Sequence, residues 1–116
     1  MSNAVAHNSA SYRAGDLLFV SGQIGIADGS LAEGVENQTA QALSNVQAVL
    51  AQNDLTLEHV VKCTVFMTDI DNFAIVNSTY ADAFGEHRPS RSAIAVKALP
   101  LGALVEIEAI AHTTKP

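Results

Sequence analysis

The sequence has one cysteine and few basic residues, and each scarcity excludes a class of protein. The single cysteine, Cys63, cannot form a disulfide within the chain and leaves no cysteine cluster for zinc. Six lysines and arginines against twelve acidic residues give a net charge of −6, with no run of basic residues. Because nucleic-acid and membrane-surface binding rely on clustered cations, neither nucleic acid nor membrane is expected as a partner.

Long apolar runs are also missing. No stretch approaches the roughly 20 apolar residues needed to cross a bilayer, and the N-terminus lacks the basic-then-apolar pattern of a signal peptide. We therefore expect a cytoplasmic protein. The length of 116 residues predicts a single domain, residues 1–116, with the small and polar residues 1–10 loosely ordered. A domain of this size has a thin core, so burial against copies of itself would help.

Two segments carry the three-and-four spacing of apolar residues that is typical of an amphipathic helix. The first is 35–52 and the second precedes Gly85. Candidate caps and ends are Gly34 and Asn53 for the first helix, and Asp69 or Asp71 and Gly85 for the second.

Four segments are predicted to be strands: 17–20, 59–68, 91–99 and 104–112. The 59–68 segment is rich in β-branched residues and apolar on both faces, which favours a central strand. Residues 25–34 hold three glycines and are expected to be turn or edge material. The order of these elements predicts an α+β fold, a mixed sheet with two helices on one face.

The predicted strand 104–112 has two different faces. Its odd positions are apolar and suit a face covered by helices, whereas Glu106 and Glu108 point away from the helices, about 7 Å apart. In the 91–99 strand, Arg91 shares a face with alanines and a lysine. If the two strands pair, cations and carboxylates meet on one surface. Periodicity alone allows this surface to be a solvated face with ion pairs or an oligomer interface that holds a pocket.

Five blocks, in this order along the chain, resemble the Rid family, the reactive intermediate deaminases that are also known as YjgF-type or L-PSP proteins. The blocks are residues 17–23, 61–67, 76–80, 91–92 and 99–111. The resemblance implies a chorismate-mutase-like fold assembled as a homotrimer, in which three sheets close around a central barrel and the active sites lie between subunits.

The resemblance also implies a reaction and a set of residues. Members similar to the archetype hydrolyse 2-iminopropanoate and 2-iminobutanoate to 2-oxo acids and ammonia, without a metal or organic cofactor. Arg91 corresponds to the family's carboxylate-binding arginine and Glu106 to its water-positioning glutamate. An arginine fork binds a carboxylate through two hydrogen bonds, and a carboxylate can orient a water and accept its proton. The further expected substrate-binding positions are Ser21, Gly22, Asn77, Ser92 and Ala93, the last through its backbone.

The chain departs from the family pattern at two positions. The archetype has a pocket tyrosine before its first strand, and counting without a gap places Asn8 there, while Tyr12 reaches the pocket only if the register slips. The family's common cysteine two residues after the arginine is Ala93 here. Side chains predicted to be structural are Phe73, Tyr80 and Phe84 in the helix core, Cys63 as a buried group, and His87 and His112 at the surface.

Three functions stay open from the sequence. The first is hydrolysis of small 2-imino acids, and its expected ligands are the small 2-imino and 2-oxo acids. The second is a non-catalytic trimer that binds a small carboxylate metabolite. The third, ribonuclease activity or translation inhibition, is disfavoured by the negative net charge.

Overall fold

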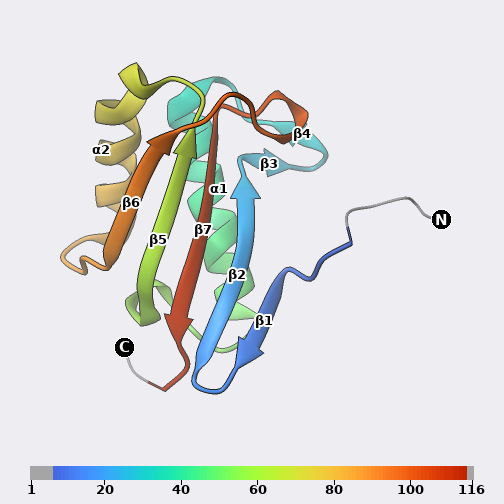
Figure 1. The fold of residues 1–116 in the computed structure, drawn as a ribbon, viewed down its shortest axis with the longest axis vertical. Helices are drawn as coiled ribbons and strands as arrows, with labels where there is room; N and C mark the ends of the chain where they lie inside the picture. Colours follow the sequence, from blue (N-terminus) through green and yellow to red (C-terminus); the bar gives the residue numbers. More distant parts are fainter. Residues whose placement is uncertain (1–6, 115–116) are drawn as a thin grey trace.

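A five-stranded sheet carries two helices on one of its faces (Figure 1). The computed structural model describes residues 7–114. The strands lie in the order β1-β2-β7-β5-β6, and β5 runs parallel to β6 and antiparallel to β7. The elements are β1 (Ser11–Ala14), β2 (Leu17–Ile24), β3 (Ile26–Ala27), β4 (Ser30–Leu31), α1 (Gly34–Ala51), β5 (Val60–Met67), α2 (Phe73–Phe84), β6 (Ser90–Ala95) and β7 (Val105–His112). The predicted α+β class and the placement of both helices on one face are confirmed.

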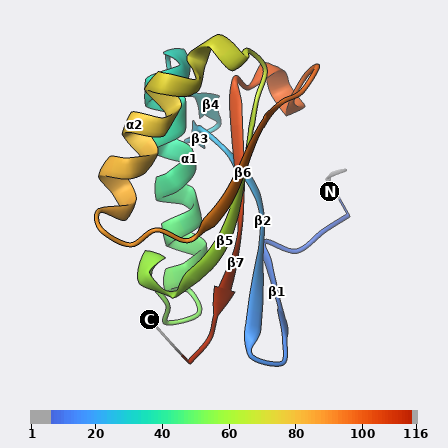
Figure 2. The same cartoon turned by 60° about the vertical axis from the view of Figure 1, so that its left-hand side comes forward.

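The core lies between the sheet and the two helices (Figure 2). The inward side chains of β2, β5 and β7 alternate with outward ones, and the apolar stripe of α1 packs against them. Its most deeply buried large side chains include Leu18, Leu43, Leu50, Met67 and Ile107. In the part of the chain that the structure describes, no helix is long and apolar enough to cross a membrane.

Both helix ends of α1 differ by one residue from expectation. The residue that precedes the helix as its cap is Glu33, and Gly34 is already the first helical residue, with φ of +79°. At the other end the left-handed residue is Asp54, with φ of +61°, not Asn53. The reason is the closing turn, in which the Leu55 N–H bonds the Leu50 carbonyl and places the left-handed position one residue later.

Gly85 ends α2 as predicted, with φ of +64°. Asp69 acts one element earlier than expected, because its carboxylate accepts a 2.9 Å hydrogen bond from the Asp71 N–H at a short 3₁₀ turn, Ile70–Asn72, that leads into α2. Asp71 therefore donates to this cap and does not itself cap the helix.

The last two strands, β6 and β7, do not pair with each other, because β5 lies between them. The predicted 91–99 strand ends at Ala95, and the chain then passes over the end of β5. There the Val96 N–H bonds the Met67 carbonyl and the Thr68 N–H bonds the Leu104 carbonyl. The predicted interior position of β5 is confirmed, and the condition under which cations and carboxylates would share one surface, pairing of the last two strands, is not met.

Glycines shape β2 and the turn that follows it. The predicted strand 17–20 continues to Ile24 because a bulge between Val20 and Gln23 admits Gly22 without ending the pairing to β7. The predicted turn segment forms the small β3–β4 ribbon, whose two turn residues Asp28 and Gly29 both have positive φ.

Candidate functional site

The register of the sheet puts Arg91 and Glu106 on opposite faces. Arg91 of β6 is in register with Cys63 of β5, and Cys63 is in register with Ala109 of β7. These positions face the helices. Glu106 is in register with Phe66, three residues from Cys63, so it points to the face without helices. Arg91 and the two glutamates therefore do not share a surface within one chain.

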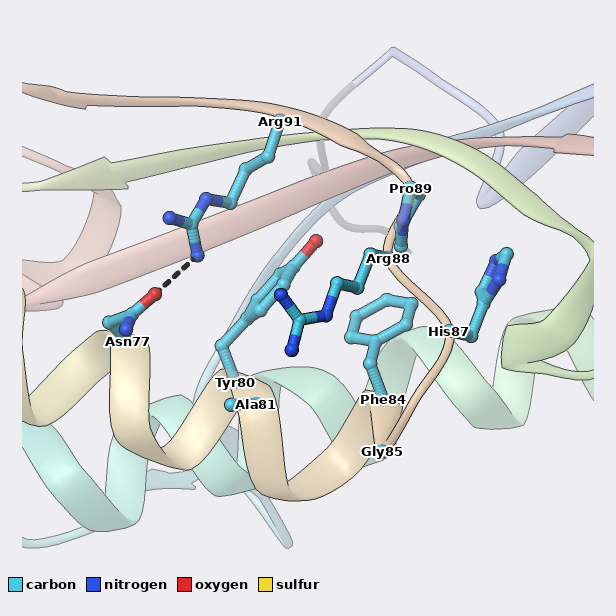
Figure 3. A pocket seen from close by; sticks show the side chains of 9 residues that line it. All are labelled: Asn77, Tyr80, Ala81, Phe84, Gly85, His87, Arg88, Pro89 and Arg91. Carbon is cyan, nitrogen blue, oxygen red and sulfur yellow. Dashed lines mark hydrogen bonds between the residues drawn. The ribbon is translucent and has the colours of Figure 1, made fainter.

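Arg91 is held on the helix side by three residues of α2. Its Nη1 donates a 2.7 Å hydrogen bond to the Asn77 side-chain oxygen (Figure 3). Its guanidinium carbon lies 4.9 Å from the centre of the Tyr80 ring and 5.6 Å from that of the Phe73 ring. Positions 73, 77 and 80 share one face of the helix, so α2 presents an amide and two aromatic faces to the cation. Asn77 thus orients the Arg91 guanidinium.

Two buried groups lie behind Arg91. The Tyr80 hydroxyl is buried beside Cys63. Burial raises the pKa of the phenol, and its interaction with the Cys63 thiol raises it further. Burial likewise raises the pKa of the Cys63 thiol. Both groups are therefore neutral near pH 7. The prediction that Cys63 is a buried side chain is confirmed, and a neutral thiol is a weak nucleophile.

A cavity of about 400 Å³ opens between α2, the loop 85–89 and the start of β6 (Figure 3). Its lining comprises Asn77, Tyr80, Ala81, Phe84, Gly85, His87, Arg88, Pro89 and Arg91. His87 was expected at the surface, but it is half-buried, and its Nε2 lies 2.7 Å from the Val60 carbonyl oxygen. A carbonyl only accepts, so Nε2–H donates and ties the loop to β5.

The second half of the site is on the open face, around Glu106. A Cβ added at Gly22 would meet the Glu106 carboxylate, so the carboxylate occupies the space that the missing side chain leaves. Burial raises the pKa of Glu106, and the negative charge of Glu108 raises it further. Glu106 is half-buried whereas Glu108 is exposed. A carboxylate with a raised pKa is a better proton acceptor than an ordinary glutamate.

Ser21 lies beside Gly22 and holds the N-terminal segment. Its hydroxyl donates a 2.6 Å bond to the Ser9 carbonyl, and its N–H donates to the Ala10 carbonyl. Residues 1–10 were expected to be loosely ordered, but Ser9 and Ala10 are anchored by these two bonds. Residues 1–6 lie outside the described residues.

Both candidates for the missing tyrosine line a hollow of about 510 Å³ on this open face. Asn8 and Tyr12 contribute to it together with Ser21 and Glu108. Tyr12 is 71% exposed, so its ring covers little of its own chain. Either residue is thus on the Glu106 side of the sheet and not on the Arg91 side.

The remaining predicted positions separate in the same way. Ser92 is exposed on the open face, and the side chain of Ala93 packs toward the core beside Arg91. β6 pairs only with β5 in the described residues, so part of its backbone is unpaired at the sheet edge, where the predicted role of the Ala93 backbone would be exercised. Residues 7–114 contain no group of three or more His, Cys, Asp or Glu placed to hold a metal ion.

Three residues at the Arg91 half were missed as site residues from the sequence. Phe73 and Tyr80 were assigned to the helix core, and Tyr80 does have only 7% of its surface exposed, but both also face the guanidinium. Arg88 was not singled out. The available signal was the spacing 73, 77 and 80, which places an amide between two aromatic rings on one helix face.

Comparisons with known proteins agree with this architecture. The family model described as endoribonuclease L-PSP matches residues 1–113. A RutC family protein of Pyrococcus horikoshii is 42% identical over 107 residues, covering 90% of this chain and 85% of the relative. The crystal structure of RidA from an Antarctic Psychrobacter is 35% identical, with a TM-score of 0.90 over 95% of this chain and 91% of that chain. TdcF of E. coli with bound serine is 35% identical, with a TM-score of 0.89 over 94% and 90%. The chain belongs to the L-PSP family, which includes the RutC and Rid proteins.

Proposed function

We propose that the protein hydrolyses small 2-imino acids, such as 2-iminopropanoate and 2-iminobutanoate, to 2-oxo acids and ammonia. The observation that carries the proposal is the fixed orientation of Arg91, held by Asn77 and stacked near Tyr80. An oriented guanidinium can bind the substrate carboxylate through two parallel hydrogen bonds. A relative of similar structure, TdcF, has been solved with a bound amino acid, serine, which supports a small carboxylate as the ligand class.

The reaction needs a water directed at the imine carbon and a proton for the departing nitrogen. Water adds to the C=N bond to give a carbinolamine, and ammonia leaves as the C=O bond forms. Glu106, with its raised pKa, accepts a proton from the attacking water and returns one to the nitrogen. The neutral imine carbon is electrophilic enough that positioning and proton transfer supply the catalysis.

A site of this kind requires a second copy of the chain, because Arg91 and Glu106 lie on opposite faces of one sheet. We propose a homotrimer in which the Arg91 half of one subunit meets the Glu106 half of its neighbour. The exposed apolar side chains of the open face support this assembly. They include Tyr12, Phe19 and Ile94.

The family description names an endoribonuclease, and the charge of this chain argues against that activity here. With a net charge of −6, only six lysines and arginines and no run of basic residues, the chain lacks the extended basic surface that binds a nucleic-acid backbone. A binding protein without turnover is the other alternative, and it needs only the Arg91 half.

The test couples an L-amino-acid oxidase to the protein and follows imine disappearance against the spontaneous rate. We expect acceleration by the wild type and a loss of at least about 100-fold in kcat/KM for Arg91→Ala, because the carboxylate loses its charged partner. The matched control is Arg13→Ala, which removes the same charge from β1 outside both half-sites. An Arg91→Ala variant that is folded and fully active would contradict the proposal. Binding of 2-oxobutanoate without hydrolysis would favour the binding protein.

A further inference from the structure

The cavity beside Arg91 is larger than a three-carbon acid requires. Its volume of about 400 Å³ falls in the range of roughly 300–1,000 Å³ that is typical of pockets for drug-sized ligands. A carboxylate bound at the Arg91 guanidinium would occupy one end. The other end, toward the loop 85–89, stays open beside Phe84 and Pro89.

The charges around this cavity are all of one sign. Two of the chain's six lysines and arginines, Arg88 and Arg91, line it, and none of the nine lining residues is acidic. Figure 3 shows the two guanidinium groups entering the same space, one from the loop and one from β6. In a chain with twelve acidic residues, this arrangement singles out the cavity as a site for anions.

The Tyr80 ring contributes to the cavity, whereas its hydroxyl is buried beside Cys63 and out of a ligand's reach. The loop that carries Arg88 is anchored by the bond from His87 to the Val60 carbonyl, so Arg88 extends from a fixed base.

We propose that the preferred substrates are 2-imino acids whose side chain carries a second carboxylate, with Arg91 binding the first carboxylate and Arg88 the second. This inference rests on the proposed function and names its substrate class. Phe84 and Pro89 flank the methylene groups of the bound acid. Arg88 is then a specificity-determining residue, while Arg91 binds the carboxylate that every substrate shares.

The test compares 2-iminoglutarate, generated by a glutamate oxidase, with 2-iminobutanoate, generated by an L-amino-acid oxidase. We expect the wild type to favour the dicarboxylate. Arg88→Gln should reduce the ratio of the two kcat/KM values about tenfold, since a charge-assisted hydrogen bond is lost for one substrate only. Arg13→Gln, the same chemical change on β1, should leave the ratio unmoved.

The structural alternative is that Arg88 only offsets the negative end of the α2 dipole. In that case Arg88→Gln would lower the melting temperature and affect the hydrolysis of both imines equally. An unchanged ratio of the two kcat/KM values in Arg88→Gln would overturn the inference, while the proposed hydrolase activity would stand. If the wild type hydrolyses neither imine, the proposed function fails. Calorimetry with 2-oxoglutarate and 2-oxobutanoate then tests separately whether the pocket prefers a dicarboxylate. A preference for 2-oxoglutarate that depends on Arg88 would support the proposed dicarboxylate pocket, and equal binding of 2-oxoglutarate and 2-oxobutanoate would overturn it.

Discussion

The two faces of one sheet differ in what covers them. On the helix face, α1 and α2 bury the inward side chains, and Arg91 finds an amide and two aromatic rings from its own chain. On the open face, Tyr12, Phe19 and Ile94 keep 71%, 41% and 45% of their surfaces exposed. A monomer in water rarely leaves so many large apolar side chains on one face uncovered.

One half of the proposed site is complete within a single chain, and the other half is not. The Arg91 half has its supporting residues in place, and only the ligand is needed to fill it. The Glu106 half has its carboxylate set against Gly22, but the hollow next to it opens to solvent. The chemistry proposed for the protein therefore depends on bringing the completed half of one copy to the open half of another.

A charge placed on the open face is expected to have the largest effect on assembly and activity. Ile94→Asp places a carboxylate where the trimer would bury an apolar side chain, so we expect the assembly to fall apart and hydrolysis to drop to the spontaneous rate. Light scattering coupled to size-exclusion chromatography measures the mass, and the imine assay measures the activity.

The chain offers a matched control for Ile94→Asp. Ile75 of α2 is also 45% exposed, but it lies on the helix side of the molecule. Ile75→Asp should keep both mass and activity. If both variants stay trimeric, or if both dissociate, the open face is not the surface that joins the subunits.

Removing the carboxylate of Glu106 tests the chemistry of the open half. Glu106→Gln should lower kcat by about 100-fold while 2-oxo acid binding persists, because a general base contributes roughly 10²–10⁴-fold. In the wild type the raised pKa should shift the acid limb of kcat/KM above that of an ordinary glutamate, and the variant should lose this limb. An unchanged kcat would make Glu108 the candidate base.

The same raised pKa predicts a stability change of defined sign. The folded state disfavours the charged carboxylate, so the wild type binds more protons folded than unfolded and loses stability as the pH rises from about 4.5 through the raised pKa. Glu106→Gln should therefore melt a few degrees above the wild type at pH 7, and the difference should shrink at pH 4. Equal melting differences at both pH values would contradict this assignment.

The contact between Gly22 and Glu106 allows a second test of the open half of the site. Gly22→Ala puts a methyl group where the carboxylate lies, so we expect Glu106 to be displaced and kcat/KM to fall about tenfold. A double-mutant cycle separates this cause from backbone strain. In a Glu106→Ala background the space is free, and Gly22→Ala should then cost little stability. If it destabilises both backgrounds equally, the carboxylate is not what the methyl group meets.

Much of the fold follows from local pattern. The odd positions of β7 are buried and its even positions are not, as their period of two predicts. α1 lies within one residue of the predicted 35–52, and α2 ends before Gly85 as predicted. These elements have strong periodicity over eight or more residues. The errors at Gly34, Asn53 and Asp69 are confined to helix ends, where several small polar residues compete for the same cap.

The pairing of strands was not available from the pattern. Consecutive strands often lie side by side, but β6 runs parallel to β5 and leaves β7 on the far side of β5. Whether Arg91 and Glu106 share a face was therefore left open by the pattern and is decided by this strand order. The residues of the site were named from the resemblance, whereas their division between two faces depends on long-range register. The role of Tyr80 beside Arg91 likewise depends on where α2 crosses β6.

The smallest predicted effect concerns how α2 aims Arg91. Asn77→Ala removes the acceptor of the 2.7 Å hydrogen bond, so the guanidinium should rotate more freely and KM should rise a few-fold with a smaller change in kcat. Asn77→Asp keeps an acceptor but adds a charge that competes with the substrate carboxylate, so its KM should rise more than that of Asn77→Ala. Ser78→Ala, the exposed neighbour on α2, should leave KM unchanged. If Asn77→Ala binds as well as the wild type, the hydrogen bond from Arg91 to Asn77 does not position the guanidinium for the substrate.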